Sequence, residues 1–254
     1  MSNPVLSEKQ WGDISDREGG LADVNAMTVN GTIMKTGLLL VVMLMSMWWM
    51  FDRFWGPAMM QSQIMPFMIG GAIGGLVLCL AMMFAKKLAM FLGLAYAVCE
   101  GLFLGGLTMI FELQYPGLPL IAASFTVATL LGMLFLYRSG IIVASPAFMK
   151  GVIGAVVGLM LGVGVLWLLS AFGIGTGIVA TLYGNGPIGI GFSVICVGLA
   201  ALSLVVDFKI IEDGAQNRAP KYMEWVGAFG LLVTLVWLYI EILRLLAKLR
   251  SSDD

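Results

Sequence analysis

The sequence after Lys35 is a succession of apolar blocks, each long enough to cross a membrane as a helix. A membrane-spanning helix needs about 20 apolar residues, because the hydrocarbon core is about 30 Å thick. The stretch between Lys150 and Asp207 has no charged residue and is too long for one span, but glycines and Pro187 divide it. The blocks predict seven spans, over residues 35–55, 64–84, 88–110, 118–137, 150–172, 188–208 and 224–246.

The composition agrees with a membrane protein. Apolar residues make up 60% of the 254-residue chain and charged residues 11%, whereas soluble domains average about 45–50% and about 25%. We therefore predict an all-α integral membrane protein whose seven-transmembrane-helix bundle occupies residues 34–250, after a polar, acidic tail over residues 1–33. The glycine-rich link before the sixth span is either a plain turn or a loop that dips back into the membrane.

Lysine and arginine counts predict the orientation, because cytoplasmic segments of membrane proteins carry an excess of these residues. If the N-terminus is cytoplasmic, the inner segments hold ten of them and the outer segments four. We therefore expect a multi-pass protein of the cytoplasmic (inner) membrane, with its N-terminus inside and its C-terminus outside. The expected partner of its surface is the lipid bilayer, and the sequence does not determine its oligomeric state.

The residue counts also exclude several classes of function. The net charge of −1 offers no basic excess for phosphates, so no nucleic-acid partner is expected. The chain has no histidine, which excludes zinc sites built on histidine and Ser–His catalysis. No other enzyme or cofactor-binding motif is present, so we expect no enzyme and no cofactor. The three cysteines lie inside apolar runs and are interpreted as buried hydrophobic residues: Cys79, Cys99 and Cys196.

Glycines recur every four residues in three of the predicted spans. This spacing places small residues on one helix face, where two helix backbones can approach closely. It indicates tight packing inside the bundle in preference to dimer formation, at Gly70/Gly74, Gly71/Gly75, Gly101/Gly105 and Gly154/Gly158/Gly162.

Charged residues within membrane spans are costly and are therefore functional candidates. Glu100 lies near the middle of the third span, where its carboxyl must be protonated, paired or bound to a cation. Asp207 closes the sixth span, either paired with Lys209 in water or facing another acid. Glu241 in the seventh span can pair with Arg244, which follows three residues later on the same helix face.

Asp207 and Glu241 can alternatively form an acidic pair between neighbouring helices. Two carboxylates held close together share a proton, because both cannot ionise cheaply. Such a pair binds either a proton or a hard cation such as Ca²⁺, which prefers oxygen ligands. In a chain without histidine, it is the obvious route to a response to pH.

The chain resembles the Bax inhibitor-1/YccA family, the transmembrane Bax inhibitor motif proteins, and is most similar to their bacterial Bax inhibitor-1-like branch. The resemblance covers nearly the whole sequence. The strongest matching segment is the run from Trp237 to Leu246 in the seventh span. The other matching segments are 3–5, 27–29, 35–37, 100–102 and 206–208, with Ile211, Glu212 and Gly214.

The resemblance implies a bundle of six helices around a central seventh span. It also implies a pH-sensitive Ca²⁺ leak, sensed by a pair of acids that falls on Asp207 and Glu241, with Glu100 at a further acidic position. Some bacterial members bind and restrain a membrane-anchored AAA protease.

The chain departs from this pattern in two ways. It has Glu241 where typical leak channels have aspartate, and 34 residues separate it from Asp207. A helix rises 1.5 Å per residue, so Glu241 lies about 25 Å beyond Glu224, whereas Asp207 lies at the inner edge. Glu224 is therefore a rival partner for Asp207, and Glu100 for Glu241.

Three functions remain as hypotheses. The leading one is a pH-modulated cation leak, with Ca²⁺ as the expected ion, titrated by Asp207 and Glu241 and lined by Glu100. The alternative is a membrane regulator that transports nothing and binds a membrane-anchored AAA protease through its polar tail. A proton-coupled carrier is the weakest of the three.

Overall fold

The computed structural model describes residues 26–55 and 61–252, and within them the chain is helical with one isolated β-bridge, between Ala26 and Pro220. Seven of the described helices are long and apolar enough to cross a membrane, which confirms the predicted all-α, seven-span architecture. These helices are α2 (Val29–Phe54), α3 (Gln61–Phe84), α4 (Ala89–Gln114, preceded by the 3₁₀ turn η1, Lys86–Leu88), α5 (Leu118–Arg138), α6 (Pro146–Ala171), α8 (Pro187–Gln216) and α9 (Met223–Ser252).

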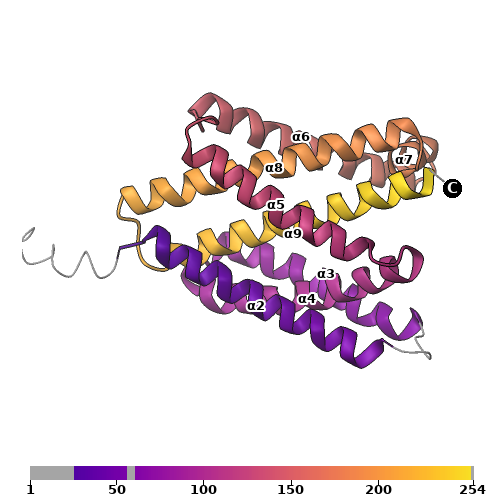
Figure 1. Ribbon diagram of the computed structural model, residues 1–254, viewed down its shortest axis with the longest axis horizontal. Coiled ribbons are helices and arrows are strands. Elements are labelled where there is room, and N and C mark those ends of the chain that lie inside the picture. Colours follow the sequence, from indigo (N-terminus) through magenta and orange to yellow (C-terminus); the bar gives the residue numbers. More distant parts are fainter. Residues whose placement is uncertain (1–25, 56–60, 253–254) are drawn as a thin grey trace, which may run out of the picture.

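The long helices lie side by side and alternate in direction (Figure 1). We call the end where α2 and α9 begin the N-terminal end of the bundle, and the opposite end, where the described chain finishes, the C-terminal end. Helix α2 begins at Val29, inside the segment assigned to the tail, because Thr28 caps it: the Thr28 side chain accepts a hydrogen bond from the Gly31 N–H. Residues 1–25 lie outside the described part of the chain.

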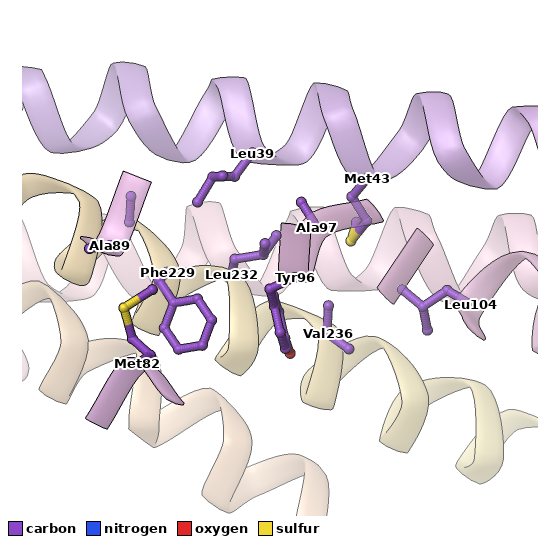
Figure 2. Close-up of a cluster of buried hydrophobic side chains, with 11 residues drawn as sticks. Leu39, Met43, Met82, Ala89, Tyr96, Ala97, Leu104, Phe229, Leu232 and Val236 are labelled. Atoms are coloured by element: carbon purple, nitrogen blue, oxygen red, sulfur yellow. The ribbon is translucent and has the colours of Figure 1, made fainter. Parts of the chain in front are cut away.

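Helix α9 is the core of the bundle. Its most apolar 18-residue window is 61% buried, whereas the corresponding windows of the other six spans are 6–39% buried. Helices α2, α4, α5 and α8 all pack against it. Figure 2 shows one of the resulting clusters, in which Tyr96 of α4 meets Phe229 of α9 edge to face, with ring centroids 4.7 Å apart. A central seventh span is the arrangement that the family resemblance implies.

The glycine-rich link between the fifth and sixth spans contains a short helix, α7 (Thr176–Tyr183), at the C-terminal end of the bundle (Figure 1). Gly173 and Gly175 adopt positive φ angles of 80° and 71°, a backbone conformation that other residues rarely adopt. With eight residues, α7 is too short to cross a membrane.

The glycine pattern has two different outcomes. On α4, a Cβ atom at Gly101 would lie 2.4 Å from the Met43 carbonyl oxygen of α2. On α3, a Cβ at Gly71 would lie 2.5 Å from the Cys99 carbonyl oxygen of α4. Tight internal packing is thus confirmed for these helices, although Gly70 itself is open. The prediction of tight internal packing is wrong for α6, because no atom lies within 4 Å of a Cβ placed at Gly154, Gly158 or Gly162. This glycine face of α6 has no partner among the described residues.

This contrast predicts opposite effects for two alanine substitutions. Gly101→Ala should lower the free energy of unfolding by about 1–3 kcal/mol, because its neighbour is backbone and cannot move aside. Gly158→Ala should be neutral or raise it by up to about 1 kcal/mol, because alanine is the better helix former and the site is open. Denaturant unfolding of both variants in detergent measures the difference. Equal effects would contradict the close approach of α2 and α4.

Candidate functional site

Asp207 lies on α8 and faces the central helix. Its Oδ2 atom is buried and has no hydrogen-bond partner among the described residues. The Thr234 side chain of α9 contacts the Asp207 carboxyl, while the Thr234 hydroxyl also donates to the Gly230 carbonyl at 3.2 Å. Lys209, the predicted alternative partner, instead pairs with Asp213 at 2.8 Å and with Glu212 at 3.8 Å. Asp207 is therefore an acid that its surroundings leave without a cation.

Glu100 lies on α4 and faces α3. Its Oε2 atom is buried and also has no hydrogen-bond partner among the described residues. Its Oε1 atom lies 3.0 Å from where a Cβ would stand at Gly75, so the absence of a side chain there makes room for the carboxyl. Tyr96, one turn earlier on α4, contacts the same carboxyl. The buried ring of Tyr96 in turn joins this acid to the core around α9 (Figure 2).

Glu241 is paired. Nη1 of Arg244 donates to both carboxylate oxygens, at 3.0 and 3.1 Å, and the indole N–H of Trp237 donates to Oε1 at 3.3 Å. The pair at a spacing of three residues is thus present as predicted from the sequence. The Arg244 guanidinium also lies over the Tyr183 ring of α7, 5.2 Å from its centre. The charge of Glu241 is therefore balanced on its own helix.

The structure does not bring Asp207 and Glu241 into contact. Asp207 meets α9 at Thr234, and Glu241 follows seven residues later, which is about 10 Å of helix rise. No group of three or more acidic or cysteine side chains among the described residues is close enough to hold a metal ion. A Ca²⁺ site shared by Asp207 and Glu241 stays a prediction.

Glu224 forms the centre of a polar cluster at the N-terminal end of the bundle. Only 1% of this residue is exposed. Its carboxylate accepts hydrogen bonds from the Thr28 N–H and the Thr28 hydroxyl, each 2.9 Å long, and pairs with Lys35 and with Lys221. The sequence suggested Glu224 as a partner of Asp207, but its carboxylate joins the start of α9 to the start of α2. This role could not be predicted from the sequence, because Thr28 and Glu224 are 196 residues apart.

Lys248 is a second residue that the sequence analysis missed. It is 3% exposed, and its ammonium group donates to the carbonyl oxygens of Leu182 at 3.0 Å and Gly189 at 2.9 Å. It therefore joins the end of α9 to α7 and to the start of α8. The sequence shows only a lysine among apolar residues near the end of the seventh span. It cannot indicate the acceptors, because these are backbone carbonyls of a distant segment.

The four acids considered so far are of two kinds. Glu224 and Glu241 have cationic partners. Asp207 and Glu100 each keep a buried carboxyl oxygen without a partner. An acid of the second kind, within a membrane, binds a proton or a cation. This arrangement can sense protons or hold a passing cation.

The family model described as Bax inhibitor 1 like matches residues 3–251, nearly the whole chain. No curated protein and no solved structure matches the chain.

The Glu224 cluster yields a prediction for stability. Glu224→Gln removes the charge that Lys35 faces and should lower the free energy of unfolding by about 3 kcal/mol, the lower end expected when a buried ion pair loses one partner. The matched variant Asp213→Asn, in an exposed pair, should cost less than about 1 kcal/mol. Denaturant unfolding in detergent compares them, and equal losses would show that the cluster does not anchor α2.

Proposed function

The chain belongs to the Bax inhibitor 1 like family, and from this premise we propose that it is a pH-modulated cation leak channel of the cytoplasmic membrane, with Ca²⁺ as the expected ion. The observation that carries the proposal is that Asp207 and Glu100 each have a buried carboxyl oxygen with no hydrogen-bond partner among the described residues. Asp207 lies on α8 and Glu100 lies on α4. Both helices pack against α9, as α2 and α5 also do.

The energetic cost of an unpaired carboxylate supports this choice. A charged side chain inside a bilayer costs several kcal/mol unless something compensates it. Glu224 and Glu241 are compensated by lysine and arginine side chains. Asp207 and Glu100 are not, so a proton or a cation in transit is the compensation that remains. In the proposal Asp207 is the titrating gate and Glu100 lines the path.

Glu241 has a different place in this proposal from the one its motif implies. Its pairing with Arg244 withholds it from an incoming cation. The Tyr183 ring offers the guanidinium a second partner through its π face. Glu241 becomes available to an ion when Arg244 moves toward that ring, so in this proposal it acts after Asp207.

The dependence on pH follows from the charge of the acid. Ionised Asp207 attracts a cation, whereas protonated Asp207 is neutral and does not. Cation flux should therefore rise as the pH increases from 5 to 8, and this rise should disappear when Asp207 can no longer ionise.

Flux of Ca²⁺ into liposomes that carry the purified protein tests the proposal. Asp207→Asn should abolish the rise with pH, and Glu100→Gln should reduce flux at every pH. Glu241→Gln should keep the rise with pH, because Arg244 already neutralises this residue. The matched control is Asp213→Asn, a partly exposed acid on the same helix as Asp207 that pairs with Lys209, and its flux should equal that of the wild type.

Two results would contradict parts of the proposal. A pH response that survives Asp207→Asn and disappears in Glu241→Gln would return the sensor to Glu241. Folded protein with no flux above that of empty liposomes would reject the channel.

The protease-regulator hypothesis remains the alternative. It depends on residues 1–25, which lie outside the described residues, and on a partner of the AAA protease class. Deletion of these residues should abolish such regulation and leave a leak intact, so one variant separates the two functions.

A further inference from the structure

A hollow of about 880 Å³ lies between α2 and α5 toward the N-terminal end of the bundle. Most of its wall is apolar, with Ile33 of α2, Leu131 of α5 and Leu231 of α9 among the lining residues. Polar groups also line it: Tyr137, Arg138, Lys209 and Glu212. The volume falls within the range of about 300–1,000 Å³ that is typical of small-molecule sites. The hollow therefore suits an amphiphile that has an apolar body and a polar head.

The hollow arises from the packing of the helices. Helices α2 and α5 both pack against α9, and the wall between them includes Gly37, which has no side chain to fill the space. No atom lies within 4 Å of a Cβ placed at Gly37. A side chain added at this position would therefore start in open space at the wall of the hollow.

The charges around the hollow leave one cation unpaired. Lys209 is balanced by Asp213 and Glu212, and Glu212 also accepts a hydrogen bond from the Tyr137 hydroxyl. Arg138 is exposed, and none of the acids among the described residues lies within ion-pair distance of it. It stands in the last turn of α5, at the end of a membrane-spanning helix. A guanidinium at this position is suited to bind a phosphate with two parallel hydrogen bonds.

We propose that this hollow is a binding site for a glycerophospholipid, whose phosphodiester pairs with Arg138 while one acyl chain lies between α2 and α5. The apolar wall favours an acyl chain, and the Arg138 guanidinium, which has no acid partner among the described residues, supplies the complementary charge. None of the acids of the leak proposal lines the hollow, although Phe208 and Lys209, which follow Asp207, do. Occupation of the hollow by lipid does not depend on whether the protein conducts ions.

Native mass spectrometry of the purified full-length protein tests the site with two probes that share the same acyl chains, phosphatidylglycerol and diacylglycerol. The wild type should bind phosphatidylglycerol at least about tenfold more tightly than diacylglycerol, since a charge-assisted hydrogen bond to the phosphate contributes roughly this factor in affinity. Arg138→Gln should remove the preference. Its control is Arg53→Gln, which changes an exposed arginine in the last turn of α2. This variant should still prefer phosphatidylglycerol to diacylglycerol.

A second pair of variants tests the apolar part of the site. Gly37→Phe should fill the hollow and weaken the binding of both probes at least fivefold. Gly70→Phe adds the same side chain at an open position of α3 that does not line the hollow, and it should bind as the wild type does. Unfolding temperatures of all four variants should stay close to that of the wild type, because none of the substituted positions is packed.

Three results would overturn the proposal. One is equal binding of the two probes by the wild type, and another is unchanged binding by both Arg138→Gln and Gly37→Phe. The third is a site that accepts phosphatidylglycerol only after residues 1–25 are deleted, because the occupant would then be the N-terminal segment of the chain itself.

Discussion

The burial of α9 is the constraint on which the other features of this bundle depend. A helix surrounded by other helices cannot direct its polar side chains to water, so each must find a partner on a neighbouring helix or on its own. Glu224 reaches α2, Thr234 meets Asp207 of α8, and Lys248 reaches carbonyls of α7 and α8. Glu241 finds Arg244 one turn later on α9 itself. These contacts fix α9 near both of its ends.

The same constraint separates structural acids from candidate functional ones. The carboxylates of Glu224 and Glu241 are balanced by cations, and breaking such a pair leaves a buried charge. Asp207 and Glu100 lie on helices that pack against α9, and each has a buried carboxyl oxygen for which the described part of the chain offers no hydrogen-bond partner. Selection for stability alone would favour an apolar residue at either position, because burying a polar group without a partner is costly. Their presence is therefore the strongest argument for function in this chain.

The sequence predicted the architecture better than it predicted the site. The number and type of the spans depend on local hydropathy, which is written in consecutive residues, and both predictions were confirmed. The Glu241–Arg244 pair was also predictable, because a spacing of three residues places both side chains on one face of the same helix. The role of Glu224 was not, because its partners on α2 are 189 and 196 residues away. Lateral packing decides such contacts, and periodicity within one helix contains no information about them.

The glycines show the same limit. A four-residue spacing of glycines indicates that one face of a helix is flat, but it does not indicate which segment covers that face. On α4 the face is covered by α2, with Gly101 against the Met43 carbonyl, whereas the corresponding face of α6 is open around Gly158. The spacing therefore predicts the capacity for close packing, and the order of helices around α9 determines where this capacity is used inside the bundle.

The Glu224 cluster and the hollow beside it have a common origin. Thr28 and Lys35 bind the Glu224 carboxylate and hold the first turns of α2 on α9. The first turns of α2 that this cluster holds also line the hollow, next to Gly37. The hollow is already open in this arrangement, so a ligand that enters it need not spend binding free energy on opening it.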